Sequence, residues 1–324
     1  MGTNSVSDSV WEEDSEEEPD ADLTDKIVVV PKADPGYEWI FAKSIKGFIT
    51  KYGGAASHMA IRCAEFEIPA AIGCGQKIYS EVSKMSYLRI DCKAEKIDEG
   101  IQYHNLSALI TQRESVNAYG YPTDVQEAAY MRFCELLGFI PKPVSNYTKN
   151  IEMLFDKKRD LLIVAGGGAL PPKFYDRPHG ETLQPNRDRT EAKLIRHCVI
   201  HGIPVIAVCR GMQYMNVLFG GKLHYHPELK VERQRQMDHP VTLVKENRQI
   251  YINNFHEDII YTGDLAPCFE PLAVDLENDV VEAFYSDEMK ILALQWHPER
   301  PFLTANAAEE TRKLIIDFMQ KYIR

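Results

Sequence analysis

Several features are missing from this sequence, and each absence excludes a class of protein. No apolar run in the 324 residues approaches the roughly 18 residues that a membrane-spanning helix needs. The first residues do not combine a basic segment with an apolar one, as a secretion signal does. Lys and Arg do not gather into the basic stripe that binds nucleic-acid phosphates. We therefore expect a cytoplasmic protein with neither a membrane nor a nucleic acid as a partner.

Cysteine pairs with CxxC spacing are also absent, although the chain contains seven cysteines. The seven are Cys63, Cys74, Cys92, Cys134, Cys198, Cys209 and Cys268. An odd, scattered set without an export signal argues against a disulfide framework and against a zinc site. We expect reduced thiols, no bound metal and no cofactor, with at most one or two cysteines of special reactivity.

Basic residues are absent from positions 1–25, which carry ten of the Asp and Glu residues. These ten charges account for nearly all of the net charge of −11, and the rest of the chain has a net charge of −1. The run from Glu12 to Asp20 is almost free of apolar side chains, so it buries too little surface to offset the entropy lost on ordering. We predict a disordered acidic tail over residues 1–25.

The length of the remaining chain suits two domains. Residues 26–103 predict a small β/β/α domain that begins with a β-branched strand and contains a glycine-rich turn before a helix. Over residues 105–324, apolar strands alternate with longer helices, which is typical of a parallel α/β sheet. In this second domain we expect one helix over 124–137 and a closing amphipathic helix over 311–323.

Residues 205–213, Val-Ile-Ala-Val-Cys-Arg-Gly-Met-Gln, predict a strand, a sharp turn and the start of a helix, with Cys209 at the corner. This is the arrangement of a nucleophile elbow, in which a small residue such as Gly211 relieves crowding two positions later. The amino terminus of a helix lowers the pKa of a thiol and offers N–H groups to an oxyanion. The alternative is that Cys209 is an ordinary buried core cysteine.

A base and a carboxylate occur together in residues 294–299, Leu-Gln-Trp-His-Pro-Glu. Residues i and i+2 of an extended segment point to the same side, so Glu299 can orient His297 while His297 takes the thiol proton. A lone histidine at a strand end would more often be structural. Together with the elbow, this segment predicts a triad of Cys209, His297 and Glu299.

At these motifs the sequence resembles the class I glutamine amidotransferases, and within them the free-standing γ-glutamyl hydrolases of peptidase family C26. The likeness runs from about residue 106 to the C-terminus. It includes Arg187-Asp188 with Glu191, Cys209-Arg210-Gly211 with Gln213 and Asn216, Gly220-Gly221, His239-Pro240-Val241, Asn254-Phe255-His256, Val281-Glu282-Ala283 and Gln295-Trp296-His297-Pro298-Glu299.

This resemblance implies a flavodoxin-like domain and assigns further residues. Gly167 and its neighbours would complete an oxyanion hole with the amide of Arg210, and Gln213 and His256 would lie beside a γ-glutamyl pocket. The alternatives are a plain strand-end turn at 166–168 and an exposed helix residue at Gln213. We expect Arg187, Asp188 and Glu191 to be structural.

One departure from the family falls at residues 223–226, Leu-His-Tyr-His, where relatives usually carry a Gln-Asp pair after the double glycine. The acceptor side of the pocket is therefore expected to be unusual. His224 and His226 have the spacing of a metal pair, but no third ligand lies nearby in the sequence, so no metal site is predicted.

The segment 50–62, with Gly53-Gly54 and Ser57-His58, resembles the swivelling phosphohistidine domain of phosphoenolpyruvate-utilising enzymes. The likeness covers about residues 26–103, with Ser57 as the N-cap of a helix that begins at His58. In that family the matching histidine, here His58, carries a phosphoryl group between two active sites, and glycine amides at a helix start suit a phosphate. The alternative is a helix-start histidine in a domain that has lost this role.

The chain contains no synthetase domain to consume ammonia, so a hydrolase is expected rather than a true amidotransferase. The resemblance of both parts suggests hydrolysis of γ-glutamyl-CDP-amidate in capsule phosphoramidate biosynthesis, with His58 as a carrier of glutamine-kinase type loaded by a separate ATP-grasp kinase chain. Two alternatives stay open. One is a general γ-glutamyl-amine hydrolase of polyamine or γ-aminobutyrate catabolism, and the other is a phosphocarrier or binding protein with a regulatory hydrolase half.

Overall fold

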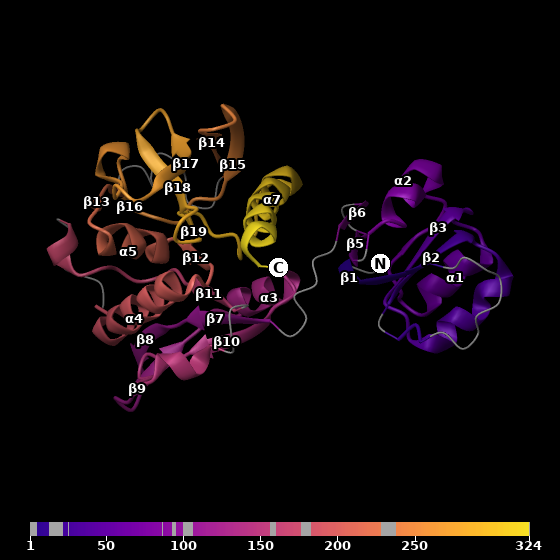
Figure 1. Ribbon diagram of the computed structural model, residues 1–324, viewed down its shortest axis with the longest axis horizontal. Helices are drawn as coiled ribbons and strands as arrows, with labels where there is room; N and C mark the ends of the chain where they lie inside the picture. The colour runs from indigo at the N-terminus through magenta and orange to yellow at the C-terminus, as the bar shows by residue number, and fades with distance from the viewer. Residues whose placement is uncertain are drawn as a thin grey trace. The chain divides into compact units, whose positions relative to one another are not determined.

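The computed structural model describes residues 5–12, 22–24, 26–85, 87–92, 95–99, 106–155, 160–175, 183–227 and 238–323. The chain folds into two compact units, Met1–His104 and Asn105–Arg324 (Figure 1). Among the helices of the described ranges, none combines the length and the apolar character that crossing a lipid bilayer requires.

The first unit is built on a six-stranded sheet with the order β4-β3-β2-β1-β5-β6. Its strands are β1 (Ser5–Glu12), β2 (Ile27–Lys32), β3 (Gly47–Tyr52), β4 (Ala70–Ala71), β5 (Tyr87–Asp91) and β6 (Lys96–Glu99). The helices are η1 (Pro35–Lys43), α1 (His58–Glu65) and α2 (Gly75–Val82). In β2, Val28 and Val30 pack into one apolar cluster, while Ile27 and Val29 pack into another. Both faces of the sheet are therefore covered, which explains the uninterrupted apolar run of β2.

The prediction of a disordered tail over residues 1–25 is wrong for Ser5–Glu12. This segment forms β1, which pairs parallel with β2 and antiparallel with β5. Only two of the ten acidic residues, Asp8 and Glu12, lie in the strand. The prediction used the average composition of residues 1–25 and so overlooked a less acidic segment that can pair on both edges. Residues 13–21, which hold most of the acidic run, lie outside the described residues.

The second unit contains a nine-stranded sheet with the order β10-β7-β11-β12-β19-β18-β17-β14-β15. The parallel strands are β7 (Ser107–Thr111), β10 (Ile140–Val144), β11 (Leu161–Val164), β12 (Val205–Val208) and β19 (Ile291–Leu294). The antiparallel extension consists of β14 (His239–Leu243), β15 (Arg248–Ile252), β17 (Glu270–Asp275) and β18 (Val280–Ser286). The five parallel strands follow the order 2-1-3-4-5, which is the flavodoxin order. The predicted flavodoxin-like fold is confirmed.

Helices accompany this sheet in the part of the unit that the structure describes (Figure 1). They are α3 (Ala128–Leu136), α4 (Pro185–His201), α5 (Arg210–Leu218) and α7 (Ala305–Tyr322). Alternate residues of β11 and β12, such as Leu162 and Val205, share one buried cluster with Leu194 of α4 and Met212 of α5. The smaller elements are β8 (Arg113–Val116), β9 (Pro122–Val125), β13 (His224–Tyr225), β16 (Asp258–Ile259), η2 (Ile151–Leu154), η3 (Pro172–Phe174) and η4 (Thr262–Asp264).

The expected helix over 124–137 begins later than predicted. Residues 122–125 form β9, which pairs antiparallel with β8, and α3 starts at Ala128. The carboxylate of Asp124 accepts hydrogen bonds from the Ser145 hydroxyl at 2.6 Å and the Asn146 side-chain amide at 2.7 Å. These partners lie about twenty residues away in the sequence, so the local pattern did not contain them.

Helix α5 packs unusually close to β11 at Gly211. A Cβ atom at this position would lie 2.2 Å from the backbone oxygen of Val164, a distance that real Cβ atoms essentially never show. The small residue is therefore required by the contact between the elbow helix and the neighbouring strand, as the sequence pattern predicts.

We expect Gly211→Ala to destabilise the second unit, because the added methyl group meets backbone atoms that cannot move away as a side chain can. Overpacking of this kind typically costs about 1–3 kcal/mol, measurable as a lower midpoint in urea denaturation. Gly263→Ala is the matched control, because a Cβ atom there meets nothing within 4 Å. Equal midpoints for the two variants would contradict the close packing.

Candidate active site

Cys209 stands at the carboxyl end of β12, at the point where the chain turns into α5. Its backbone has φ 52° and ψ −110°, a conformation rarely adopted by a residue with a side chain. The turn is held on both sides, because the Cys209 N–H donates to the Leu294 carbonyl at 2.7 Å and the Gln213 N–H donates to the Cys209 carbonyl at 3.0 Å. Cys209 therefore occupies the strained corner that a nucleophile elbow requires.

His297 and Glu299 follow β19, the strand that pairs with β12. The Nδ1 atom of His297 lies 2.6 Å from Oε1 of Glu299, and both side chains are buried. The side chain of Asn253 makes two hydrogen bonds with the backbone of His297. Its oxygen accepts the His297 N–H and its NH₂ group donates to the His297 carbonyl, both at 2.9 Å. Asn253 was missed from the sequence because it lies on a loop far from this segment in the chain.

The electrostatics of His297 depend on its two neighbours. Burial by itself lowers the pKa of the imidazole, but the negative charge of a Cys209 thiolate and the hydrogen bonds to Cys209 and Glu299 outweigh burial and raise the pKa to about 9. The imidazole is therefore protonated at neutral pH and hydrogen-bonded to the sulfur. This arrangement can hold a thiolate and can deliver a proton.

A glycine loop, residues 166–168, follows β11 and lies against these side chains. A Cβ atom on Gly166 would lie 2.9 Å from Cε1 of His297 and 3.3 Å from Cβ of Cys209, so only glycine fits. Gly167 has φ 83°, in the left-handed region that glycine favours. Arg210 is the first residue of α5, so its N–H has no acceptor within the helix. The geometry brings the predicted oxyanion-hole residues to the same end of the sheet as Cys209.

His58 belongs to the first unit, where it is the first residue of α1. The Ser57 side chain caps this helix by accepting the N–H of Ala60 at 3.3 Å. The Nε2 atom of His58 lies 3.5 Å from Oε1 of Glu38, and the two side chains are 42% and 47% exposed. Glu38 also accepts a hydrogen bond from Arg62 at 2.9 Å. Sequence reasoning missed Glu38 because it comes from η1, before the glycine-rich turn.

Each of these two sites lies in a segment that matches a known family model. Residues 105–299 match the family model described as Peptidase C26. The chain belongs to the peptidase C26 family. Residues 23–95 match the model described as the mobile domain of PEP-utilising enzymes. The peptidase C26 unit is accordingly a hydrolase of glutamine-amidotransferase-like type, and it is joined to a unit of the PEP-utilising type.

Relatives of the peptidase C26 unit occur in several bacteria. Protein NtpR of Enterococcus hirae is 29% identical over 204 residues, which cover 56% of this chain and 80% of that protein. A γ-glutamyl-γ-aminobutyrate hydrolase of Escherichia coli O157:H7 is 28% identical over 176 residues, covering 46% of this chain and 67% of that protein. Among solved structures, a glutamine amidotransferase of Thermotoga maritima has a TM-score of 0.41 and 15% identity over 68% of this chain and 86% of its own.

Gln213 and His256, the residues predicted to line a pocket, are both buried in the peptidase C26 unit. The side-chain nitrogen of Gln213 donates to the Asp258 carbonyl at 3.1 Å and to the side chain of Gln295 at 3.3 Å, so Gln213 is not an exposed helix residue. The Nε2 atom of His256 lies 3.7 Å from a carboxylate oxygen of Glu282. The preceding Phe255 ring meets the His297 ring edge-on at 5.4 Å. A role of Gln213 and His256 in substrate binding stays a prediction.

The unusual histidines at 224 and 226 both have polar partners within the second unit. The Nε2 atom of His224 lies 2.8 Å from Oδ2 of Asp264, and the Nδ1 atom of His226 lies 3.5 Å from the Tyr261 hydroxyl. The His224 ring also packs against the Tyr261 ring, with centroids 5.0 Å apart, so both histidines contact Tyr261.

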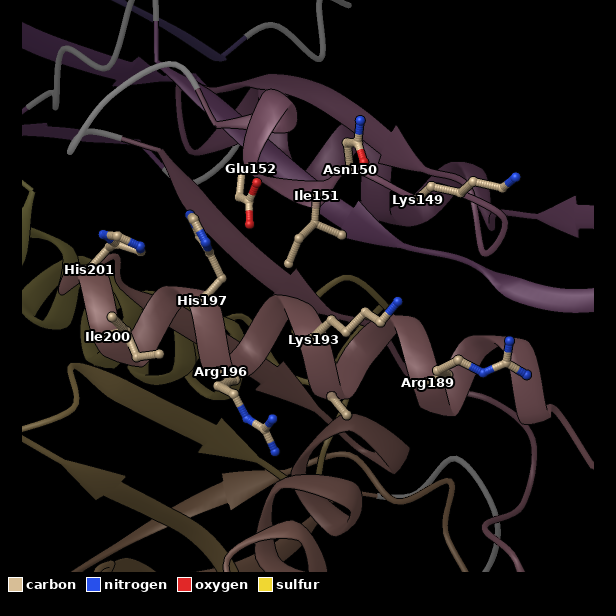
Figure 2. A pocket seen from close by; sticks show the side chains of 11 residues that line it. Lys149, Asn150, Ile151, Glu152, Arg189, Lys193, Arg196, His197, Ile200 and His201 are labelled. Carbon is tan, nitrogen blue, oxygen red and sulfur yellow. The ribbon is translucent and has the colours of Figure 1, made fainter.

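A cavity of about 580 Å³ lies between α4 and η2, and it contains none of the predicted site residues (Figure 2). Four cations line it, namely Lys149, Arg189, Lys193 and Arg196. Figure 2 shows that their charged ends do not converge, because Lys193 points toward η2 whereas Arg196 points away from it. We interpret this region as a solvated face of α4.

We expect Glu299→Gln to lower the pKa of His297, because the substitution removes a negative charge that stabilises the imidazolium. In the wild-type protein the ring should lose its proton near pH 9, and the corresponding nitrogen resonance can be followed by NMR titration. Since this pKa exceeds the ordinary value of 6.5, protonated His297 stabilises the fold fully below about pH 6.5, and this contribution is lost as the pH rises through about 9.

The resonance is assigned by its disappearance in His297→Gln. Glu246→Gln, at an exposed pair with Arg248, is the control and should leave the titration unchanged. An identical His297 titration in Glu299→Gln and wild type would contradict the electrostatic account.

Proposed function

We propose that the peptidase C26 unit hydrolyses γ-glutamyl amides, with Cys209 as nucleophile, His297 as acid and base, and Glu299 as the carboxylate that orients His297. The observation that carries this proposal is the buried His297–Glu299 pair beside a cysteine on a strained elbow. A relative from Escherichia coli is named as a γ-glutamyl-γ-aminobutyrate hydrolase, which supports this class of substrate.

The geometry supports a two-step reaction. The Cys209 thiolate attacks the γ-carbonyl carbon, and the carbonyl electron pair moves to oxygen, where the N–H groups of Gly167 and Arg210 stabilise it. The intermediate collapses, the C–N bond breaks, and protonated His297 gives its proton to the departing amine. Water then attacks the thioester while His297 takes its proton, which releases glutamate and restores the thiolate.

The leaving group is proposed from the combination of the two units. The chain joins a peptidase C26 unit to a PEP-utilising mobile domain. We propose from this combination a place in phosphoramidate biosynthesis, with γ-glutamyl-CDP-amidate as the preferred substrate. A panel of γ-glutamyl amides tests this choice. Faster release of glutamate from simple amines than from the nucleotide-linked amide would favour a general γ-glutamyl-amine hydrolase.

Cys209→Ala should reduce glutamate release by at least about 10³-fold, because loss of a nucleophile leaves only the oxyanion site and substrate binding. The matched controls are Cys63→Ala and Cys134→Ala. Burial raises the pKa of both thiols to about 12, so neither ionises at neutral pH. Glutamate release is measured with a coupled dehydrogenase assay, and substantial activity in Cys209→Ala would rule out the proposed triad.

We further propose that His58 accepts a phosphoryl group from a separate ATP-grasp kinase chain. The match to the PEP-utilising mobile domain and the position of His58 at a capped helix start support this role. Arg62, which now pairs with Glu38 and Glu65, lies one turn along the same helix and can supply positive charge to a phosphate.

Incubation with labelled ATP and an ATP-grasp kinase should label the wild-type protein and Ser57→Ala but not His58→Ala. The label should be lost in acid and kept in alkali, as expected for phosphohistidine and not for phosphoserine. Glutamate release should be unchanged in His58→Ala, because the Cys209 chemistry requires no phosphate. Acid-stable label, or a parallel loss of hydrolysis, would count against an independent carrier.

A further inference from the structure

Arg187 holds the carbonyl groups of the glycine loop. It is fully buried in the first turn of α4, and its guanidinium donates to three successive backbone carbonyls. These belong to Ala165, to Gly166 at 3.1 Å and to Gly167 at 2.7 Å. A planar guanidinium with several fixed donors can hold such a set together, whereas the single ammonium group of lysine cannot.

The direction of these carbonyls determines where the amides point. In a planar trans peptide, the C=O of one residue and the N–H of the next point in opposite directions. The contacts of Arg187 with the carbonyls of Gly166 and Gly167 therefore turn the N–H groups of Gly167 and Gly168 away from Arg187. Over the described ranges, neither N–H has a backbone or side-chain acceptor.

Tyr130 holds the other side of the same loop. Its hydroxyl accepts the Gly166 N–H at 2.8 Å, and the residue is buried on α3. Burial and the negative charge of Glu299 hold the pKa of Tyr130 well above its usual value, so the hydroxyl stays protonated. The contact of Arg187 with the Ala165 carbonyl turns the Gly166 N–H toward Tyr130 in the same way, so Tyr130 uses this amide and the Gly167 N–H remains for a ligand.

Glu191 links this loop to the other amide of the proposed oxyanion hole. One of its oxygens accepts from Arg187 at 2.7 Å, and the other accepts from Arg210 at 2.8 Å. Burial opposes the ionisation of Glu191, but the two guanidinium groups outweigh it and keep its pKa below the ordinary value. Because Arg210 follows Cys209 directly, the carboxylate joins the glycine loop to the elbow.

We propose that Arg187 and Tyr130 are positioning residues for the oxyanion site. They orient residues 166–168 so that the Gly167 N–H faces the oxygen that becomes negative when Cys209 attacks, and Glu191 keeps this loop in register with Arg210. The inference rests on the proposed γ-glutamyl hydrolase function. It assigns a role in transition-state stabilisation to Arg187 and Glu191, which the sequence pattern alone presents as structural.

Two reactions of the same cysteine separate this role from a purely structural one. Hydrolysis of a γ-glutamyl amide passes through an oxyanion, whereas alkylation of Cys209 by iodoacetamide displaces iodide and forms none. The variants are Arg187→Lys and Tyr130→Phe. The control is Tyr175→Phe, which also removes a buried hydroxyl, one that donates to the Asp258 carboxylate at 3.3 Å. Alkylation is followed at the Cys209 peptide by mass spectrometry, and folding by thermal melting.

Loss of one oxyanion donor typically lowers kcat by about 10²–10³-fold, so we expect Arg187→Lys to lower kcat by at least about tenfold. Because the oxyanion exists only after attack, KM should stay within about threefold and the alkylation rate within about twofold. Tyr130→Phe should change kcat in the same direction, and Tyr175→Phe should leave both rates unchanged.

A parallel fall of hydrolysis and alkylation in the variants would overturn the positioning role, because the defect would then lie in the thiolate. Unchanged hydrolysis in Tyr130→Phe would overturn it as well, even if Arg187→Lys fails to fold. If wild-type protein alkylates at Cys209 but releases no glutamate from any γ-glutamyl amide, the proposed function fails, and the inference fails with it. These results are distinguishable from one another.

Discussion

The parallel pairing of β12 with β19 is the constraint on which the rest of the site depends. Val208 is in register with Leu294, and the Cys209 N–H donates to the Leu294 carbonyl. Both strands therefore end at the same edge of the sheet, where one strand turns sharply into α5 and the other continues to His297. Neighbouring strands lie about 4.8 Å apart, so this register alone brings a thiol and an imidazole within reach of each other.

Buried carboxylates hold buried cations in two places around this edge. Glu299 orients the imidazolium of His297, and Glu191 lies between the guanidinium groups of Arg187 and Arg210. In each case an isolated buried charge would be costly, so the carboxylate and its cations stay charged only while they are paired. The pairing fixes their relative positions. The same dry surroundings strengthen the hydrogen bonds that would meet a developing negative charge.

Much of this could be predicted from the sequence because the decisive motifs are local. The strand, elbow and helix around Cys209 are contiguous, and His297 and Glu299 lie only two residues apart. The structure brings these two side chains together in a turn closed by the Arg300 N–H and the His297 carbonyl, and not in the extended segment that the sequence suggests. Tyr130 and Asn253 could not be found in this way. Each acts through contacts with residues distant in the chain, and neither has a local pattern that distinguishes it from a core tyrosine or a loop asparagine. The elements near Asp124 were missed for the same reason.

The position of β1 has a consequence for how the first unit assembles during synthesis. β1 is the only link between the parallel strands β2, β3 and β4 and the hairpin of β5 and β6, since β2 does not pair with β5 in the described sheet. β1 is synthesised before all of these strands. Its edge that pairs with β5 therefore stays unpaired until almost the whole first unit has left the ribosome. Such long-range closure slows folding and leaves a strand edge exposed to other chains in the meantime. The sequence directly after β1 is rich in Asp and Glu, and like-charge repulsion between nascent chains opposes their association.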